Sequence, residues 1–305
     1  MALGDKEIQA VLKAIDDGLI TFNEALPQIE SNIYKRLLRF QRELSVQGET
    51  ITNSAANIRM LSQLQSDLEQ IILSDSGYGA SVEKLVKLFS KVDALNFAYF
   101  KVLEKKFKPP KLIEEVRKQS ISLTINGLTE SGIDANIINP LRQVINTYVT
   151  TGGSYAELSK ELNNYITGTP EIDGALSKYA KLYATDAINQ YVSTVNSITS
   201  ADLGWKWFKY VGSNIKTTRT FCKALTQKKY YHKSELPRII KGDFEEFRQM
   251  KGKIYDRTGL PQGLIEDTNP SNFQTYRGGY NCGHQAYPIP NIFVPKELLS
   301  KFANN

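Results

Sequence analysis

The sequence predicts a mainly α protein, in which a long multi-helix N-terminal region is followed by a small, loop-rich α+β C-terminal domain. Apolar residues recur at helical spacing through the first two hundred positions. Beyond Ser200 the chain becomes rich in Gly, Pro, Tyr and Asn, and its apolar runs become short. A length of 305 residues is enough for two domains of ordinary size. We therefore expect domains at residues 1–200 and 201–305.

Successive apolar stripes predict the N-terminal helices. The first stripe begins at Ile8, and Gly18 is expected to end its helix. Thr21, followed three positions later by Glu24, matches a capping box for the next helix. Further boundaries are expected at a turn over residues 75–79, at Pro109-Pro110, and between helices near residues 134–149, 154–166 and 172–199.

The C-terminal region predicts short elements joined by long connections. Residues 205–211 are short and aromatic, as in a strand, and Gly212 begins a turn. Residues 258–275 are expected to be mostly loop. Because such a region has a poor core for its length, we expect a metal, a disulfide or a partner to stabilise it. Short helices are expected at residues 234–240, at residues 244–250 and, after Pro288-Ile289-Pro290, near residues 296–302.

The positive charge of the chain is concentrated in the C-terminal region. The net charge is +6, and residues 201–305 carry 17 Lys and Arg against 9 Asp and Glu. Such a surface attracts phosphate backbones or acidic proteins, although charge runs most often only keep a surface solvated. The candidates for phosphate, DNA or partner contact are Lys216, Arg219, Lys223, Lys228, Lys229 and Arg277.

Two further patterns bear on location. No apolar run approaches the roughly 20 residues that a membrane-spanning helix needs. The first residues lack a basic segment leading into an apolar stretch and a small-residue cleavage site. We therefore expect a protein with no membrane partner and no signal peptide.

Both cysteines and both histidines of the chain fall within 63 residues of the C-terminal region. Thiolate and imidazole are the usual ligands of structural zinc, which takes four of them tetrahedrally. Cys282 and His284 are a close pair, and Gly283 between them would let both side chains turn toward one point. The best candidate zinc ligands are Cys222, Cys282 and His284, with His232 the weakest fourth.

The ligand spacing is not that of a common zinc finger, so other interpretations stay open. The two cysteines could be buried free thiols, as free cysteine usually is. They could also pair as a disulfide in a particle released from a cell. His284 could equally be a histidine bonded to backbone.

Two polar segments surround these cysteines. In the first, Asn214 can cap a turn, and Thr217 or Thr218 can cap a short helix that carries Arg219 and Cys222. The second, residues 276–285, contains three glycines that permit close backbone approach. The two segments could line a common site, but no nucleophile–base pair follows from their spacing, so we assign no catalytic residue.

These segments resemble a known family. Residues 217–222 read Thr-Thr-Arg-Thr-Phe-Cys, residues 277–285 read Arg-Gly-Gly-Tyr-Asn-Cys-Gly-His-Gln, and Pro-Ile-Pro follows at 288–290. In this order they are similar to the C-terminal domain of tailed-bacteriophage minor head proteins of the Mu F-like head morphogenesis family. The resemblance covers residues from about 205 to 290. The sequence departs from the family at Asn214, where Asp is frequent, and at Gly283-His284, where Arg-Cys is frequent.

The resemblance implies a structural, low-copy capsid protein near the portal that acts in head morphogenesis and DNA packaging. Its expected partners are the portal protein or the major capsid protein, with packaged double-stranded DNA bound independently of sequence. Its expected location is the virion, in the capsid interior or at the portal vertex, with the host cytoplasm during assembly. We expect no enzymatic activity; the alternatives are a metal-dependent nuclease or toxin-like enzyme built on the Cys, His and Arg cluster, and a host helical adaptor.

Overall fold

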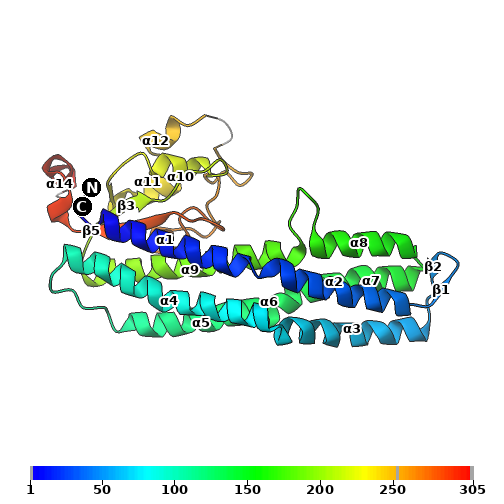
Figure 1. The fold of residues 1–305 in the computed structure, drawn as a ribbon. Coiled ribbons are helices and arrows are strands. Elements are labelled where there is room, and N and C mark those ends of the chain that lie inside the picture. Colours follow the sequence, from blue (N-terminus) through cyan, green and yellow to red (C-terminus); the bar gives the residue numbers. More distant parts are fainter. Residues whose placement is uncertain (1–2, 252–253, 303–305) are drawn as a thin grey trace. The chain divides into compact units, whose positions relative to one another are not determined.

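The computed structural model describes residues 3–251 and 254–302, and it confirms a mainly α protein with a small α+β C-terminal region (Figure 1). The helices of the first two hundred residues are α1 (Asp5–Asn23), α2 (Leu26–Glu43), α3 (Ala55–Ser74), α4 (Ser76–Leu103), α5 (Leu112–Thr129), α6 (Ser131–Ile133), a π-helical turn (Asp134–Ile138), α7 (Asn139–Thr151), α8 (Tyr155–Thr167) and α9 (Ala175–Asp202). Strands β1 (Val46–Gln47) and β2 (Thr50–Ile51) form a small antiparallel hairpin between α2 and α3.

The C-terminal region alternates short strands and helices. Its elements are β3 (Trp207–Val211), α10 (Thr220–Leu225), β4 (Tyr231–His232), a 3₁₀ turn (Lys233–Glu235), α11 (Leu236–Ile240), α12 (Glu245–Arg248), α13 (Phe273–Tyr276), β5 (Gln285–Ile289), a 3₁₀ turn (Asn291–Phe293) and α14 (Lys296–Lys301). Of the helices that the structure describes, none combines the length and the hydropathy of a membrane-spanning segment.

The chain forms two compact units that do not follow a single cut in the sequence. One unit comprises residues Asp17–Lys87 and Ile121–Ala184. The other comprises Met1–Asp16, Leu88–Ser120 and Thr185–Asn305, so it joins the C-terminal region to helical segments from three parts of the chain. Helices α1, α4, α5 and α9 have residues in both units.

The unit formed by Asp17–Lys87 and Ile121–Ala184 is built mainly on α2, α3, α7 and α8, which run side by side in Figure 1. Helix α2 contacts α3 and α8, and α7 contacts the same two helices. Side-chain caps define their ends: the Ser54 hydroxyl accepts from the backbone N–H of Asn57 at the start of α3, and Ser154 accepts from Glu157 at the start of α8. Gly152 ends α7 in the left-handed conformation with φ of 69°.

Three expected helix boundaries were wrong. Helix α1 continues through Gly18 to Asn23, because the buried residues Ile15 and Phe22 on either side hold it in place against the roughly 1 kcal/mol that an interior glycine costs. Thr21 lies inside that helix, where its hydroxyl donates to the Asp17 carbonyl at 3.0 Å instead of capping α2. The expected turn at residues 75–79 is reduced to Asp75, whose carboxylate accepts from the backbone N–H of Tyr78 and so starts α4.

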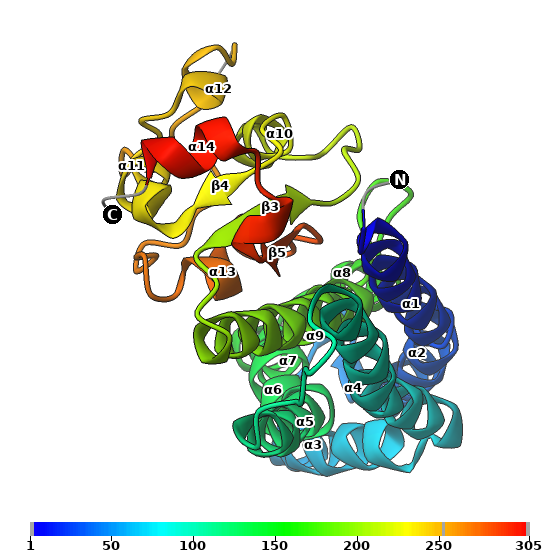
Figure 2. The ribbon, with the colours of Figure 1, turned by 90° about the vertical axis from the view of Figure 1, so that its left-hand side faces the viewer.

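The C-terminal region is organised around a three-stranded antiparallel sheet of order β4-β3-β5 (Figure 2). The expected strand at residues 205–211 is its central strand β3. Strand β5 was not expected, because it contains Pro288, opposite Phe208. A proline is tolerated there since β5 lies at the edge of the sheet and its outer side needs no N–H donor.

Buried polar contacts within this unit join β5 to the C-terminal half of α9. The side-chain amide of Gln285 donates to the Asn189 side chain at 2.7 Å, and the Ser193 hydroxyl donates to the Gln285 carbonyl oxygen at 2.7 Å. All three side chains are almost completely excluded from solvent. Because a buried polar group without a partner is strongly unfavourable, these bonds fix the register of the strand on the helix.

Candidate metal centre

A buried cluster of sulfur and nitrogen atoms lies at one end of β3 and β5. Cys222 comes from α10, and Cys282 and His284 come from the loop that leads directly into β5. The pairing of Val211 with Gln285 brings that loop to the end of β3. Residues 60 positions apart in sequence therefore meet because the sheet pairs its first and last strands.

The three side chains have the separations of a shared metal site. The two sulfurs lie 3.7 Å apart, and the Cys282 sulfur lies 3.9 Å from Nδ1 of His284. All three ligand atoms lie within 4.8 Å of one another. Zinc–sulfur bonds of about 2.3 Å and zinc–nitrogen bonds of about 2.0 Å, at tetrahedral angles, would give separations of about 3.8 and 3.5 Å. The group can therefore hold a metal ion without large rearrangement.

The environment of His284 also fits a ligand. Its ring is buried, and its Nε2 atom has no hydrogen-bond partner among the described residues. The ring stacks on that of Tyr210, with centroids 5.6 Å apart and planes 13° apart. The backbone carbonyl of His284 accepts from Arg277. The alternative of a histidine ring hydrogen-bonded to backbone does not hold for Nε2, which makes no such bond. The ring nitrogen that faces the sulfurs is Nδ1, 3.9 Å from that of Cys282, so Nδ1 is the atom that would coordinate a metal.

Gly278 provides the space beside the two sulfurs. A Cβ atom at this position would lie 2.4 Å from the Cys282 sulfur and 2.5 Å from the Cys222 sulfur. Gly283, to which the sequence analysis assigned this flexibility, has open space around its Cβ position. The glycine that the cluster requires is therefore Gly278, and Gly283 imposes no such constraint.

The two thiols are free and electrostatically unequal. The pKa of Cys282 lies well below its ordinary value, because the Cys222 thiol donates to it and because His284 and Arg277 also stabilise its thiolate. The pKa of Cys222 is raised well above its ordinary value by that hydrogen bond to Cys282 and by burial. A sulfur separation of 3.7 Å is far from the roughly 2.05 Å of a disulfide.

Arg219 connects the two polar segments around the cysteines, residues 214–222 and 276–285. It occupies the N-cap position of α10, and its guanidinium donates to the carbonyl oxygens of Gly278 at 2.7 Å and Tyr280 at 2.5 Å. The expected threonine cap of this helix is absent, since the Thr218 hydroxyl instead accepts from the backbone N–H of Ile215. Arg219 therefore holds the glycine-rich loop against the start of α10.

Arg277 is not placed to contact a phosphate, contrary to expectation. It is only 1% exposed, and its guanidinium donates to the carbonyls of His284, Gln274 and Thr275 and to the Ser193 hydroxyl. Because its donors are used by backbone and by α9, this arginine organises the loop that carries the cluster.

Asp186 of α9 also belongs to the site, although no motif pointed to it. Its carboxylate accepts from the backbone N–H of Asn281 at 2.5 Å, and Asn281 is a non-glycine residue in the left-handed region with φ of 57°. Burial raises the pKa of Asp186, while the Asn281 bond and the charges of Arg219 and Arg277 oppose that shift. Asp186 thus fixes the turn directly before Cys282.

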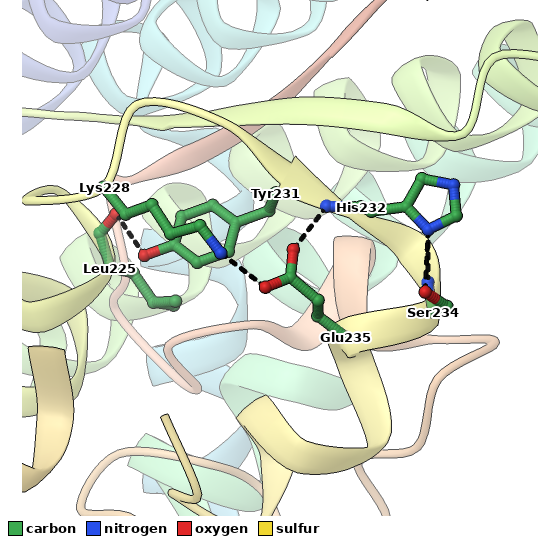
Figure 3. A network of polar contacts seen from close by, with 6 residues as sticks. All are labelled: Leu225, Lys228, Tyr231, His232, Ser234 and Glu235. Atoms are coloured by element: carbon green, nitrogen blue, oxygen red, sulfur yellow. Dashed lines mark hydrogen bonds and ion pairs between the residues drawn. The ribbon is translucent and has the colours of Figure 1, made fainter. Parts of the chain in front are cut away.

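His232 does not join the cluster. It lies on β4 with its ring 4.9 Å from that of Trp207 and 5.0 Å from that of Phe302. Its Nδ1 contacts the Ser234 hydroxyl at 2.7 Å, as Figure 3 shows. The ring is held in an aromatic cluster and caps the following turn, so the structure does not supply it as the fourth ligand.

The expected phosphate-binding lysines differ in availability. Lys216 and Lys229 are exposed and Lys223 is half-buried. Lys228 forms an ion pair with Glu235 and lies 4.8 Å from the centroid of the Tyr231 ring (Figure 3). Lys216, Lys223 and Lys229 are thus the expected contacts that the structure leaves open to a partner.

The chain matches no protein-family model, no curated protein and no solved structure among those with which it was compared.

Proposed function

We propose that this chain is a low-copy structural protein of a tailed-bacteriophage head, acting near the portal in head morphogenesis. The observation that supports this most is the convergence of the two motif segments that resemble the Mu F-like family. Arg219 and Cys222 of the first segment lie against Gly278, Tyr280 and Cys282 of the second. Residues that define a family motif are expected to meet in one place when the motif describes one structural unit.

The chemistry of the site favours a stabilising role over a catalytic one. Arg219 donates to two backbone carbonyls, and Arg277 is buried with carbonyl and hydroxyl partners. These were the arginines that a nuclease would use on a phosphate. With their donors directed at the protein itself, the nuclease alternative loses the groups that would offset charge in its transition state.

We further propose that the metal held by Cys222, Cys282 and His284 is structural zinc. Zinc prefers sulfur and nitrogen ligands, and bound zinc contributes directly to the folding of small domains. Among its described residues, the segment between β3 and β5 contains only short helices and one two-residue strand. A metal bound by Cys222, Cys282 and His284 would cross-link α10 to the loop before β5. That loop has no regular secondary structure of its own.

Charge supports a contact with packaged DNA. The unit that contains the C-terminal region carries 27 Lys and Arg against 17 Asp and Glu, whereas the other unit carries 11 against 15. A net positive unit of this kind binds duplex phosphate without reading sequence. The portal or major capsid protein is the proposed protein partner.

The proposal is tested by quantitative peptide mass spectrometry of purified phage particles and precursor heads, calibrated against the major capsid protein. We expect a few to tens of copies per head. Absence from both particle types would reject the head-protein proposal.

Zinc is tested separately on the purified full chain by elemental analysis. We expect stoichiometric zinc in the wild type, loss of zinc in Cys282→Ser, and retention in His232→Asn, which alters a histidine outside the cluster. Equal zinc content in all three proteins would reject the assignment of ligands.

A further inference from the structure

The cluster has three ligand atoms from Cys and His, whereas structural zinc takes four ligands. The fourth candidate from sequence, His232, is held between Trp207 and Phe302. A fourth donor must therefore come from another residue or from solvent. The residues in contact with the two sulfurs indicate which of these two sources supplies the fourth donor.

The hydroxyl of Tyr210 lies next to both sulfurs. It is 3.3 Å from the sulfur of Cys222 and 3.8 Å from the sulfur of Cys282. A zinc–oxygen bond of about 2.0 Å and a zinc–sulfur bond of about 2.3 Å, at a tetrahedral angle, would separate oxygen and sulfur by about 3.5 Å. The two observed separations lie on either side of that value.

The Tyr210 oxygen thus completes a set of four potential metal ligands with the two sulfurs and the His284 ring nitrogen. Its two separations from sulfur accompany the 3.7 Å between the sulfurs and the 3.9 Å between Cys282 and the His284 ring. These four separations match those of ligands around one small ion, and the Cys222 sulfur lies within 4.8 Å of the His284 ligand atom.

The hydroxyl also lacks a strong hydrogen-bond partner. Tyr210 is only 4% exposed, and the partners of its hydroxyl among the described residues are the two sulfurs. Sulfur is a weak donor and acceptor, whereas a buried tyrosine hydroxyl usually finds oxygen or nitrogen. The nearer sulfur, at 3.3 Å, is that of the neutral Cys222 thiol, and a ligand shared by the hydroxyl and both sulfurs accounts better for this placement.

The surroundings hold Tyr210 in this position. Its backbone pairs with Ala286 in the sheet, and its ring stacks on His284. Gly212, two residues on, lies so close to the His284 ring that a Cβ atom there would be 2.6 Å from it. The strand, the stacked ring and the close glycine together direct the hydroxyl and the imidazole to the same side.

We propose that Tyr210 supplies the fourth ligand, so that the site binds zinc through two thiolates, one imidazole and one phenolate. The inference rests on the proposed zinc site. Coordination breaks the O–H bond of Tyr210 and the S–H bond of Cys222, forms zinc–oxygen and zinc–sulfur bonds and releases both protons to solvent, with no change of oxidation state. The guanidinium of Arg277, bonded to the His284 carbonyl, offsets the added negative charge.

The test uses the full chain, titrated with Co²⁺ as a spectroscopic probe that replaces zinc. Wild type is compared with Tyr210→Phe and with the matched variant Tyr231→Phe, which removes another buried hydroxyl of the same core that donates to the Leu225 carbonyl at 3.1 Å. We expect thiolate-to-cobalt charge transfer and a tyrosinate difference absorption in wild type and in Tyr231→Phe. Tyr210→Phe should keep the charge-transfer band, lose the tyrosinate signal and bind at least about tenfold more weakly.

Two other outcomes separate the two proposals. If wild type shows charge transfer but no tyrosinate signal, and Tyr210→Phe binds Co²⁺ equally well, Tyr210 only donates to a thiolate and the zinc site stands without it. If wild type shows no charge-transfer band, both the zinc site and its fourth ligand are rejected. Far-ultraviolet circular dichroism of all three proteins establishes that each is folded.

Discussion

The guanidinium of Arg219 donates to the carbonyl oxygen of Gly278 at 2.7 Å, across 59 positions of sequence. This bond places the start of α10, and with it Cys222, against the glycine whose α-carbon faces both sulfurs. The position of the cluster therefore depends on an arginine that is not itself a ligand.

Replacing Arg219 with Lys should weaken both stability and metal binding. Lysine keeps the charge, but a single ammonium cannot reproduce the planar fork that reaches the Gly278 and Tyr280 carbonyls. We expect a loss of about 1–2 kcal/mol in the free energy of unfolding by urea titration. The matched variant Arg238→Lys alters an exposed pair with Asp243 and should change stability by less than about 1 kcal/mol. Equal effects of the two changes would contradict a specific role for Arg219.

Replacing Gly278 with Ala should disrupt the cluster, whereas Gly283→Ala should be tolerated. The added methyl at Gly278 would overlap both sulfurs and force the loop or α10 to move, which typically costs about 1–3 kcal/mol. At Gly283 the same methyl meets open space and the backbone needs no positive φ. Thermal unfolding and zinc content of the two variants provide the measurement. Normal zinc content in Gly278→Ala would show that the sulfurs can separate without losing the site.

The fold was predictable from sequence where a single periodicity governs an element. The stripes ending near Pro109-Pro110, and the glycines at 152 and 168, locate helices that the structure contains. Helix α5 has exposed apolar residues such as Leu123, so its stripe is weak and it was not expected. Local propensity also failed at Gly18, where packing outweighs it.

The site was predictable only as a set of residue types. Concentration of Cys and His in one region indicated Cys222, Cys282 and His284, which the structure brings together. It ranked His232 as the weakest fourth candidate but could not exclude it, because burial among aromatic rings depends on the pairing of β3 with β4. Tyr210 and Asp186 reach the cluster through strand pairing and helix packing, and no local pattern distinguishes them from core residues.

His232 should make stability depend on pH. Burial and the charges of Lys206 and Lys233 lower its pKa in the folded protein, and Glu235 only partly opposes them. The unfolded state, with a pKa of about 6.5, therefore binds the proton first, and the free energy of unfolding falls as pH drops below that value. His232→Asn keeps an acceptor for the turn and removes the titration. The urea midpoint of unfolding should fall less from pH 8 to pH 5 in this variant than in wild type. An equal fall in both proteins would exclude His232 as a contributor to the pH dependence.

DNA binding, if the proposal holds, should depend on the exposed lysines and not on the buried or paired cations. Lys216 and Lys229 are exposed, whereas the Lys228 ammonium is paired with Glu235. Each lost phosphate contact lowers the slope of log affinity against log salt concentration by about 0.9. We therefore expect the double change Lys216→Ala and Lys229→Ala to lower the slope by up to about 1.8, and Lys228→Ala to leave it nearly unchanged. Fluorescence anisotropy on two duplexes of unrelated sequence, across a range of salt, measures this. A slope unaffected by the double change would exclude these lysines, and binding independent of salt would reject the phosphate contact itself.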